Sequence, residues 1–341
     1  MHVGRRYELS QTLRWSRRNW LGPLVWAVVA TALFDLAGFK WLGIPTLPMS
    51  LIGIAVAFYL GFKNNASYDR TWEARKIYGA IVNASRSWAF SARDLVSPVH
   101  GGEVSDTELE EIRTTLVHRH VAWMDALRHQ LRKVKSWEHD SAHFENLRKM
   151  YKVPEFFEDV TEVLTPNLSE AERDEVLSMI NPAAHLLSLQ SRHLSELRER
   201  GLLDGFSHME LQKLLHELMT QQGKAERIKN FPFPRQYATV NFFYATLFAL
   251  MIPFGLLPEF SKLTTSLGPY AIWFTVPFST LVSWVFLTTD QIGDWSENPF
   301  EGLANDVPIT AMSRGIERDI RQMVGESELP APRENVGNIQ F

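Results

Sequence analysis

Three large apolar residues, Ile54, Phe58 and Phe62, recur at every fourth position, a spacing that places them along one face of a helix. A second stripe, one position earlier, consists only of small residues: Gly53, Ala57 and Gly61. The small stripe lies about 100° around the helix and suits the close approach of a neighbouring helix. Packing in lipid or in a core is the ordinary explanation for such apolar side chains. A large stripe beside a small one, continuing into a polar helix, instead indicates a helix that lines something.

His139 and His143 are the residues whose spacing best suits a metal ion, because residues four apart share one helical face. Carboxylates stand close to them in the chain: Glu138, Asp140 and Glu145. The His-Glu-x-x-His pattern is absent, and the chain has no cysteine for a thiolate site. We therefore expect no metal and no catalysis at this position.

Two broad function classes find no support in the sequence. Glycine-rich phosphate loops, the nucleophile elbow and the kinase signature are absent, so the chain is not predicted to be an enzyme. The formal net charge of −4 argues against a nucleic-acid-binding protein, which is usually strongly positive. A membrane protein is favoured, because the apolar residues are clustered in a few long stretches.

Four apolar stretches predict four membrane spans: residues 20–44, 47–62, 237–257 and 267–287. The second is short, which indicates that other helices shield it. Pro253 and Pro277 predict kinks, tolerated where neighbouring helices satisfy the freed carbonyls. Residues 258–266 are predicted to form a short outer turn. Asp35, in the last third of the first span, is either a functional ionisable group or a residue that reaches the interface.

Basic residues cluster on one side of the predicted spans. Five arginines precede the first span, and further lysines and arginines follow the second and precede the third. The two short outer loops offer only Lys40 and Lys262. The positive-inside rule then places both termini and the polar central region in the cytoplasm.

The chain divides into six predicted segments: an interfacial N-terminal arm (1–19), a transmembrane hairpin (20–65), a cytoplasmic helical domain (66–236), a second transmembrane hairpin (237–289), a cytoplasmic C-terminal segment (290–325) and a disordered tail (326–341). The central domain shows helical periodicity without strand alternation. Predicted breaks fall at 98–102, 165–167, 181–182 and 201–205, and a final amphipathic helix is predicted over 309–325. Ser169, with Glu172 three residues on, is a predicted helix cap. The fold class is all-α.

Three blocks of the sequence resemble the signature of the bacterial bestrophins. They are residues 53–76, which include Phe-Tyr-Leu-Gly-Phe-Lys-Asn-Asn; residues 222–230, Gln-Gly-Lys-Ala-Glu-Arg-Ile-Lys-Asn; and residues 292–300, which end in Glu-Asn-Pro-Phe. The blocks occur in the family's order, and the layout covers nearly the whole chain. The resemblance implies an all-α membrane protein with four transmembrane helices per subunit and a large cytoplasmic helical region. It also implies a homopentamer in the lipid bilayer, with permeant ions passing through a central pore.

The resemblance further implies which residues form that pore. The family's neck residues fall on Ile54, Phe58 and Phe62, the stripe that periodicity marks, and a cytoplasmic constriction falls near Met209. Anions, chloride above all, are the first choice of permeant ion because most of the family is described as anion-conducting. A monovalent-cation channel for sodium is the alternative, which the net negative charge favours. A phenylalanine ring has a positive edge and a negative face, so its orientation decides between the two.

Animal members of the family hold calcium with an acidic run after the Asn-Pro-Phe motif. The acidic candidates in this chain are Glu297, Glu301 and Asp306, which do not form a continuous cluster. Calcium takes about six to eight oxygen ligands. These three residues are therefore expected to serve subunit contacts or helix caps, and no cofactor is predicted.

A membrane transporter and a membrane-anchored enzyme or helical scaffold are the more distant alternatives. A transporter would usually show internal repeats with spans broken at matching positions, and none is found in the sequence. A tethered enzyme would need a cluster of titratable residues, whereas the charges of the central region are dispersed. The sequence therefore favours a channel.

Overall fold

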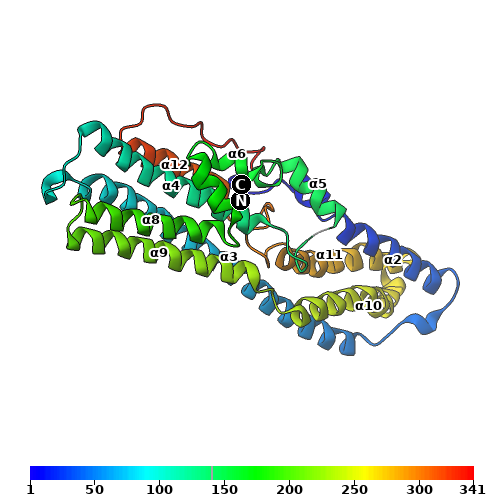
Figure 1. Cartoon of the computed structure of the whole chain (residues 1–341). Coiled ribbons are helices and arrows are strands. Elements are labelled where there is room, and N and C mark those ends of the chain that lie inside the picture. The colour runs from blue at the N-terminus through cyan, green and yellow to red at the C-terminus, as the bar shows by residue number, and fades with distance from the viewer. Residues whose placement is uncertain (140) are drawn as a thin grey trace. The chain divides into compact units, whose positions relative to one another are not determined.

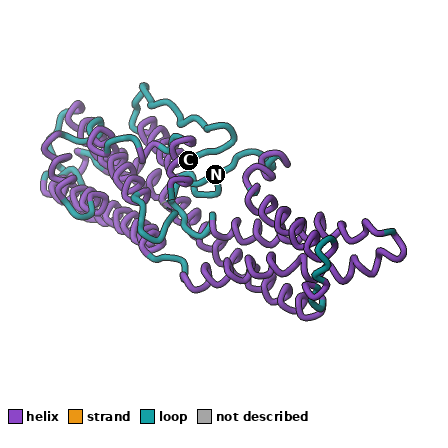
Figure 2. The backbone as a smooth tube through the Cα atoms, turned by 90° about the vertical axis from the view of Figure 1, so that its right-hand side faces the viewer, coloured by secondary structure: helices purple, strands orange, loops and turns teal. Residues whose placement is uncertain are grey.

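The computed structural model describes residues 1–139 and 141–341, which fold as helices joined by loops. Figure 2 shows helices throughout the described chain and no strand. Extended pairing in this part of the chain is limited to isolated bridges, such as the one between His2 and Ile339. The predicted all-α class is confirmed.

The chain divides into two compact units, named here the large unit and the apolar unit. The large unit comprises Met1–Val3, Thr71–Pro232 and Asn298–Phe341. The apolar unit comprises Gly4–Arg70 and Phe233–Glu297. The long helix α3 (Thr46–Leu95) contributes residues to both, and the division falls after Arg70.

The apolar unit contains α1 (Leu9–Trp15), α2 (Arg17–Asp35), η1 (Lys40–Leu42), the first part of α3, α10 (Arg235–Leu267), η4 (Pro269–Phe274) and α11 (Thr275–Asp294). Helices α2, α10 and α11 pack against one another. Three segments of the described chain are long and apolar enough to cross a membrane: Lys40–Leu95, Arg235–Leu267 and Pro269–Asp294. Helix α2 is not among them, so the first predicted span, residues 20–44, stays a prediction.

Helix α10 continues through Pro258 to Leu267, so the outer turn predicted at 258–266 is wrong. A proline leaves the carbonyl four residues earlier without its helical donor. For Pro258 this carbonyl belongs to Phe254, and it accepts a hydrogen bond from the Ile44 N–H at 3.1 Å. Helix α10 does not end at Pro258 because Ile44, in the loop before α3, supplies the missing N–H donor.

The other prolines of the apolar unit are accommodated in similar ways. Pro253 frees the carbonyl of Ala249, which lies 3.4 Å from the donating hydroxyl of Ser283 on α11. Pro277 lies in the first turn of α11, where a proline removes no intrahelical hydrogen bond. The predicted compensation by a neighbouring helix is confirmed at Pro253.

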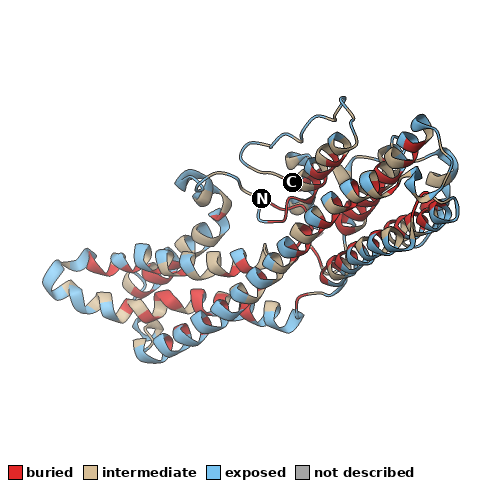
Figure 3. Ribbon diagram, turned by 90° about the vertical axis from the view of Figure 1, so that its left-hand side faces the viewer, coloured by how far each residue is buried: buried red, intermediate tan, exposed pale blue. Residues whose placement is uncertain are grey.

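The large unit contains the second part of α3, η2 (Pro98–His100), α4 (Asp106–Arg132), α5 (Ala142–Tyr151), η3 (Pro154–Phe156), α6 (Val160–Leu164), α7 (Glu170–Ser178), α8 (Pro182–Glu199), α9 (Gly205–Asn230) and α12 (Ile309–Met323). Helix α4 lies beside α8 and α12, and α8 lies beside α9 (Figure 1). Buried residues gather on the facing sides of the helices (Figure 3), and they include Trp88, Trp123 and Leu186.

The predicted breaks between the helices of the large unit are confirmed. Each predicted break falls at the ends of α-helices, and α12 matches the final amphipathic helix to within two residues. The Ser169 hydroxyl accepts a hydrogen bond from the Glu172 N–H at 3.3 Å and so caps α7.

The C-terminal tail, residues 326–341, differs from the disordered segment that its composition predicts. Glu326 lies 2.5 Å from the ring of His118, oxygen to nitrogen, and Arg333 pairs with Glu158 at 3.0 Å. A contact with His118 and an ion pair with Glu158 therefore tie this segment, whose prolines and charges would otherwise favour disorder, to the rest of the large unit.

Candidate functional site

The predicted neck residues, Ile54, Phe58 and Phe62, lie on one exposed face of α3. Ile54 is 68% exposed, Phe58 is 66% exposed and Phe62 is 55% exposed in the single chain. The rings of Phe58 and Phe62 meet edge to face, with centroids 4.6 Å apart and planes at 85°. One chain therefore presents an apolar strip that its own packing leaves uncovered.

The opposite face of α3 is buried within the apolar unit. Its buried residues recur three or four positions apart: Gly53, Val56, Leu60, Lys63 and Ser67. At about 100° per residue, the centre of this set lies about 180° from the centre of the neck residues. Val56 and Leu60 belong to one apolar cluster with Phe248 of α10. Packing of this face against its neighbours thus turns the neck residues outward.

The predicted small-residue face of α3 is divided between buried and exposed positions. A Cβ atom on Gly53 would lie 2.6 Å from Cζ of Phe248, so the glycine allows close approach of α10. Ala57 and Gly61 are exposed, and no described atom outside the local helix lies within 4 Å of a Cβ placed on Gly61. The geometry at Gly53 agrees with the predicted packing role, which stays a prediction at the other two positions.

Polar side chains join α3 to α11 directly after the apolar stripe. Lys63 Nζ lies 2.8 Å from Asp290 Oδ1, and both side chains are buried. Asn64 donates from Nδ2 to the Thr289 carbonyl at 3.1 Å. A Cβ atom on Gly293 would lie 2.8 Å from Asn64 Oδ1, so the glycine leaves room for this amide. These five residues form a contact between the two helices that we name the polar clamp.

Other ionisable candidates of the apolar unit also have structural partners. Arg70 donates from Nε to the Glu297 carbonyl at 2.8 Å, and Arg235 donates to Glu297 Oε1 at 2.6 Å. Burial raises the pKa of Glu297, and the nearby Arg235 opposes that rise. Asp35 accepts a hydrogen bond from the Trp273 ring nitrogen at 3.2 Å. These contacts give both carboxylates a packing role.

The loop after the Asn-Pro-Phe motif is wrapped around the carboxylate of Asp306. Three backbone N–H groups donate to this carboxylate at 2.6–2.7 Å, those of Phe300, Gly302 and Val307. Arg132 Nη1 donates to Asp306 Oδ2 at 2.6 Å. Both charged side chains are buried. The guanidinium of Arg132 therefore supplies the positive charge that this loop needs.

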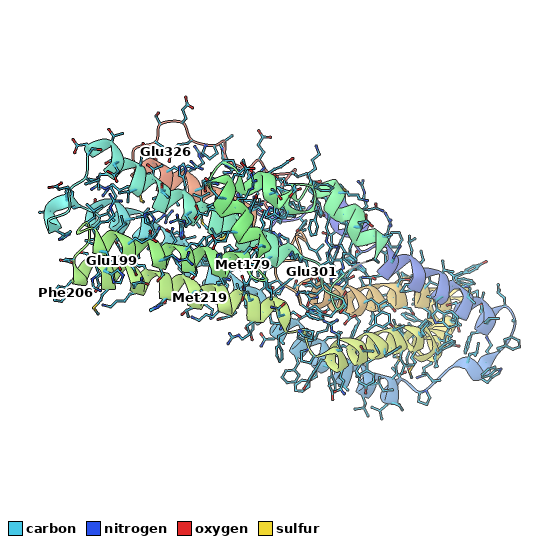
Figure 4. The ribbon with its side chains drawn as sticks, in the orientation of Figure 1. Met179, Glu199, Phe206, Met219, Glu301 and Glu326 are labelled. Carbon is cyan, nitrogen blue, oxygen red and sulfur yellow. The ribbon has the colours of Figure 1, made fainter. Side chains whose placement is uncertain are left out.

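The residues present do not fit the calcium site of the animal family members. Glu301 (Figure 4) accepts the backbone N–H of His139 at 3.2 Å, and its Oε2 lies 2.8 Å from His139 Nδ1. Glu297 and Asp306 are held by arginines, so all three acidic candidates have protein partners. In the described chain, no group of three or more His, Cys, Asp or Glu is arranged to hold a metal ion.

The two histidines with metal-ligand spacing do not share a helical face. Helix α5 begins at Ala142, so His139 precedes the helix that carries His143. His139 pairs with Glu301, whereas the ring of His143 meets the ring of Phe144 at 5.4 Å between centroids. Asp140, one of the three carboxylates named beside these histidines, lies outside the described residues.

Met209, the predicted cytoplasmic constriction, lies on α9 and is exposed. Phe206 and Met219, labelled in Figure 4, are exposed on the same helix. This helix therefore offers apolar side chains that one chain does not cover. A constriction would form only between copies, so the role of Met209 stays a prediction.

Sequence reasoning missed the partners that hold the site together. Lys63 and Asp290 are 227 residues apart, and Arg132 and Asp306 are 174 apart. A signal for the first pair exists, because a buried lysine after one apolar span needs a carboxylate near the end of another. The choice among the available carboxylates required the fold.

Comparison with known proteins agrees with the resemblance found in the sequence. Residues 17–322 match the family described as Bacterial/Fungal Bestrophin protein. The chain is 31% identical over 307 residues to the voltage-dependent anion channel-forming protein YneE of Escherichia coli, covering 88% of this chain and 84% of that protein. It is 33% identical over 285 residues to a voltage-dependent anion channel-forming protein of Ralstonia nicotianae, covering 83% and 79%. A solved bestrophin homologue from Klebsiella pneumoniae matches with a TM-score of 0.73 and 27% identity, over 91% of this chain and 98% of that one.

Proposed function

The chain belongs to the bacterial and fungal bestrophin family, and we propose that it forms an anion channel whose pore is lined by α3. Two of its relatives are named voltage-dependent anion channel-forming proteins. The family consists of ion channels and not of enzymes, as the absence of enzyme signatures from the sequence predicts.

The observation that carries the proposal is the exposed face of α3. The neck residues point away from the packing of their own chain, and the same sector of the helix continues with Asn65 and Asp69, which are also exposed. All these residues lie within about 80° of one another at about 100° per residue. A face that changes from apolar to polar in this way suits a water-filled path that narrows at an apolar ring.

In the proposed homopentamer, five copies of α3 surround one axis and bring the neck residues together. Fifteen apolar side chains then form a constriction that dewets when narrow and conducts after a small widening. Gating therefore requires only a small movement of α3. Met209 of α9 is proposed to form a second ring at the cytoplasmic end of the path.

The ring geometry of Phe58 and Phe62 supports anion conduction over cation conduction. The planes of the two rings are nearly perpendicular, at 85°. Two perpendicular rings cannot both turn their negative faces toward one axis. With these rotamers, at least one layer of the neck cannot turn its negative ring faces to the axis, and a layer that turns its positive ring edges inward favours an anion.

The proposed placement has four spans, with residues 20–44 crossing beside the three longer apolar segments. The spans cross a bacterial inner membrane. Both termini and the large unit lie on its cytoplasmic side, because the basic residues flank the ends of the spans that face them. The neck then lies within the bilayer, where the surrounding helices shield its short apolar length.

The selectivity is tested by reversal potentials in planar bilayers that contain the purified protein. With a tenfold chloride gradient and equal sodium on both sides, we expect a reversal potential close to about 59 mV in magnitude. With a tenfold sodium gradient and equal chloride, it should lie close to zero. A channel that follows the sodium gradient would contradict anion selectivity and would support the cation alternative.

Assembly is tested by the mass of the detergent-solubilised protein after subtraction of bound detergent. We expect about five times the 39.2 kDa of one chain, as for a closed ring with five-fold symmetry. A monomer or dimer would contradict a pore on the axis. Such a result would leave the family assignment intact and remove the proposed path.

A further inference from the structure

We infer that the Lys63–Asp290 ion pair sets the rotational position of α3, and thereby holds the neck residues toward the axis. The inference rests on the proposed function, because it assigns a positioning role for the same pore. Lys63 directly follows Phe62 in the chain and lies on the buried face of α3.

The contacts at this point are directional. Lys63 Nζ donates to Asp290 Oδ1 at 2.8 Å and lies 3.4 Å from the Asp290 carbonyl oxygen. The Lys63 side chain is 1% exposed and the Asp290 side chain 9%. Asn64 adds a second bond to α11 through the Thr289 carbonyl at 3.1 Å. Together these bonds restrict the rotation of α3 about its own axis relative to α11.

The remainder of the buried face of α3 cannot fix that angle as sharply. Gly53 has no side chain, and Val56 and Leu60 make apolar contacts, which are non-directional. The hydroxyl of Ser67 is buried and has no hydrogen-bond partner in the described chain. A side-chain tip lies about 5–6 Å from the helix axis, so a roll of about 20° displaces it by about 2 Å. A displacement of this size at Phe58 or Phe62 is enough to change the width of a narrow constriction.

Stability and positioning are separable at a buried ion pair. Removing one partner leaves the other charge buried without compensation, which destabilises the fold. Replacing both partners with apolar residues of similar size is often neutral or stabilising. A variant in which both Lys63 and Asp290 are apolar therefore retains stability while it lacks the directional bond between these two residues.

The experiment reports the angle of α3 through cysteine chemistry. The natural chain has no cysteine, so F58C carries a single thiol. The parent F58C channel, reconstituted in liposomes, is treated with a small charged methanethiosulfonate reagent, and the modification rate is measured. The rate is then measured in F58C combined with K63M, with D290L and with the pair K63M/D290L. Thermal unfolding of each protein is recorded in parallel.

We expect modification of F58C to slow by about tenfold in all three backgrounds, the change that about 1.4 kcal/mol of rotational bias produces. Unfolding temperatures should fall in K63M and D290L and recover in K63M/D290L. The matched control is K262M, which breaks the exposed Lys262–Glu259 pair of the same unit and should leave the rate unchanged. If a single variant does not fold, the double variant decides.

The outcomes separate the inference from the proposed function. A parent F58C protein that the reagent does not modify would remove the pore assignment itself, and the inference with it. A reactive parent whose rate is unchanged in the Lys63 and Asp290 variants would overturn the inference alone. Recovery of both stability and rate in K63M/D290L would also overturn it, because the pair would then be merely structural.

Discussion

The ring of Phe58 meets the ring of Phe62 edge to face on the exposed side of α3, with 4.6 Å between their centroids. Residues four apart on a helix support one another in this way, and an edge-to-face pair stabilises both rotamers. Both side chains are more than half exposed in the single chain, so the rest of the chain covers them only in part. The shape of the proposed neck therefore depends on the pair and not on either ring alone.

Truncation of the neck residues should open the channel. We expect Ile54→Ala, Phe58→Ala and Phe62→Ala each to raise single-channel conductance or open probability, because each widens the apolar ring. The double variant F58A/F62A should differ from the sum of its singles, since removing one ring frees the rotamer of the other. The matched control is Val25→Ala, an exposed apolar position on α2 that should leave currents unchanged. Unchanged currents in all three single variants would refute the pore lining.

Two glycines of α3 should respond oppositely to alanine. In Gly53→Ala the new Cβ lies 2.6 Å from the buried ring of Phe248, and such overpacking costs about 1–3 kcal/mol. The gain in helix propensity, about 1 kcal/mol at most, offsets only part of this. In Gly61→Ala the new Cβ atom has no described atom within 4 Å outside the local helix, so this variant retains the gain in helix propensity.

The measurement for these glycines is thermal unfolding in detergent, together with the oligomeric mass. Gly53→Ala should lower the unfolding temperature at unchanged mass. Gly61→Ala should keep the stability of the chain and reduce the assembled fraction if the small face packs against another copy. Equal effects of both substitutions on stability would contradict the division of this face.

Local patterns predicted the elements of the site, and non-local contacts decided how they are held. The stripe of neck residues is visible in the sequence because it depends only on helical spacing. Lys63 was visible as a charge after an apolar span, but its partner Asp290 lies 227 residues away. The predicted outer turn at Pro258 was wrong because a proline normally ends a helix. Here Ile44 donates a hydrogen bond to the carbonyl that the proline frees, and the helix continues. Helix propensity carries no information about hydrogen-bond partners that are distant in the sequence.

Arg132 should hold the loop at Asp306 without help from calcium. The unfolding temperature of the natural protein is expected to be the same in calcium and in a chelator, because the carboxylate already has four donors. Arg132→Met leaves Asp306 buried without its cation and should destabilise the large unit by about 3–5 kcal/mol. The control Arg86→Met breaks an exposed ion pair to Asp319 and should change stability by less than about 1 kcal/mol. Marked stabilisation of the natural protein by calcium would contradict the internal cation.

His120 should make the large unit sensitive to acid. Its ring is fully buried between Trp88 and Trp123, and neither ring nitrogen has a hydrogen-bond partner in the described chain. Burial lowers the pKa of His120 from 6.5 to about 3. The unfolded chain therefore binds a proton below about pH 6.5 that the folded chain refuses until about pH 3, so this residue makes stability fall as the pH drops through that window.

The contribution of His120 is isolated by comparing the natural protein with His120→Leu between pH 7 and pH 4. Buried carboxylates such as Glu138, whose pKa is raised by burial, act in the opposite direction, but they are common to both proteins and cancel in the difference. We expect the free energy of unfolding of the natural protein to fall, relative to that of His120→Leu, by up to about 1.4 kcal/mol for each unit by which the pH drops. Chemical unfolding of the detergent-solubilised proteins measures it. His216→Leu, at an exposed position on α9, controls for the loss of a histidine. Parallel pH profiles for the natural protein and His120→Leu would show that the buried ring gains a proton more easily than its surroundings suggest.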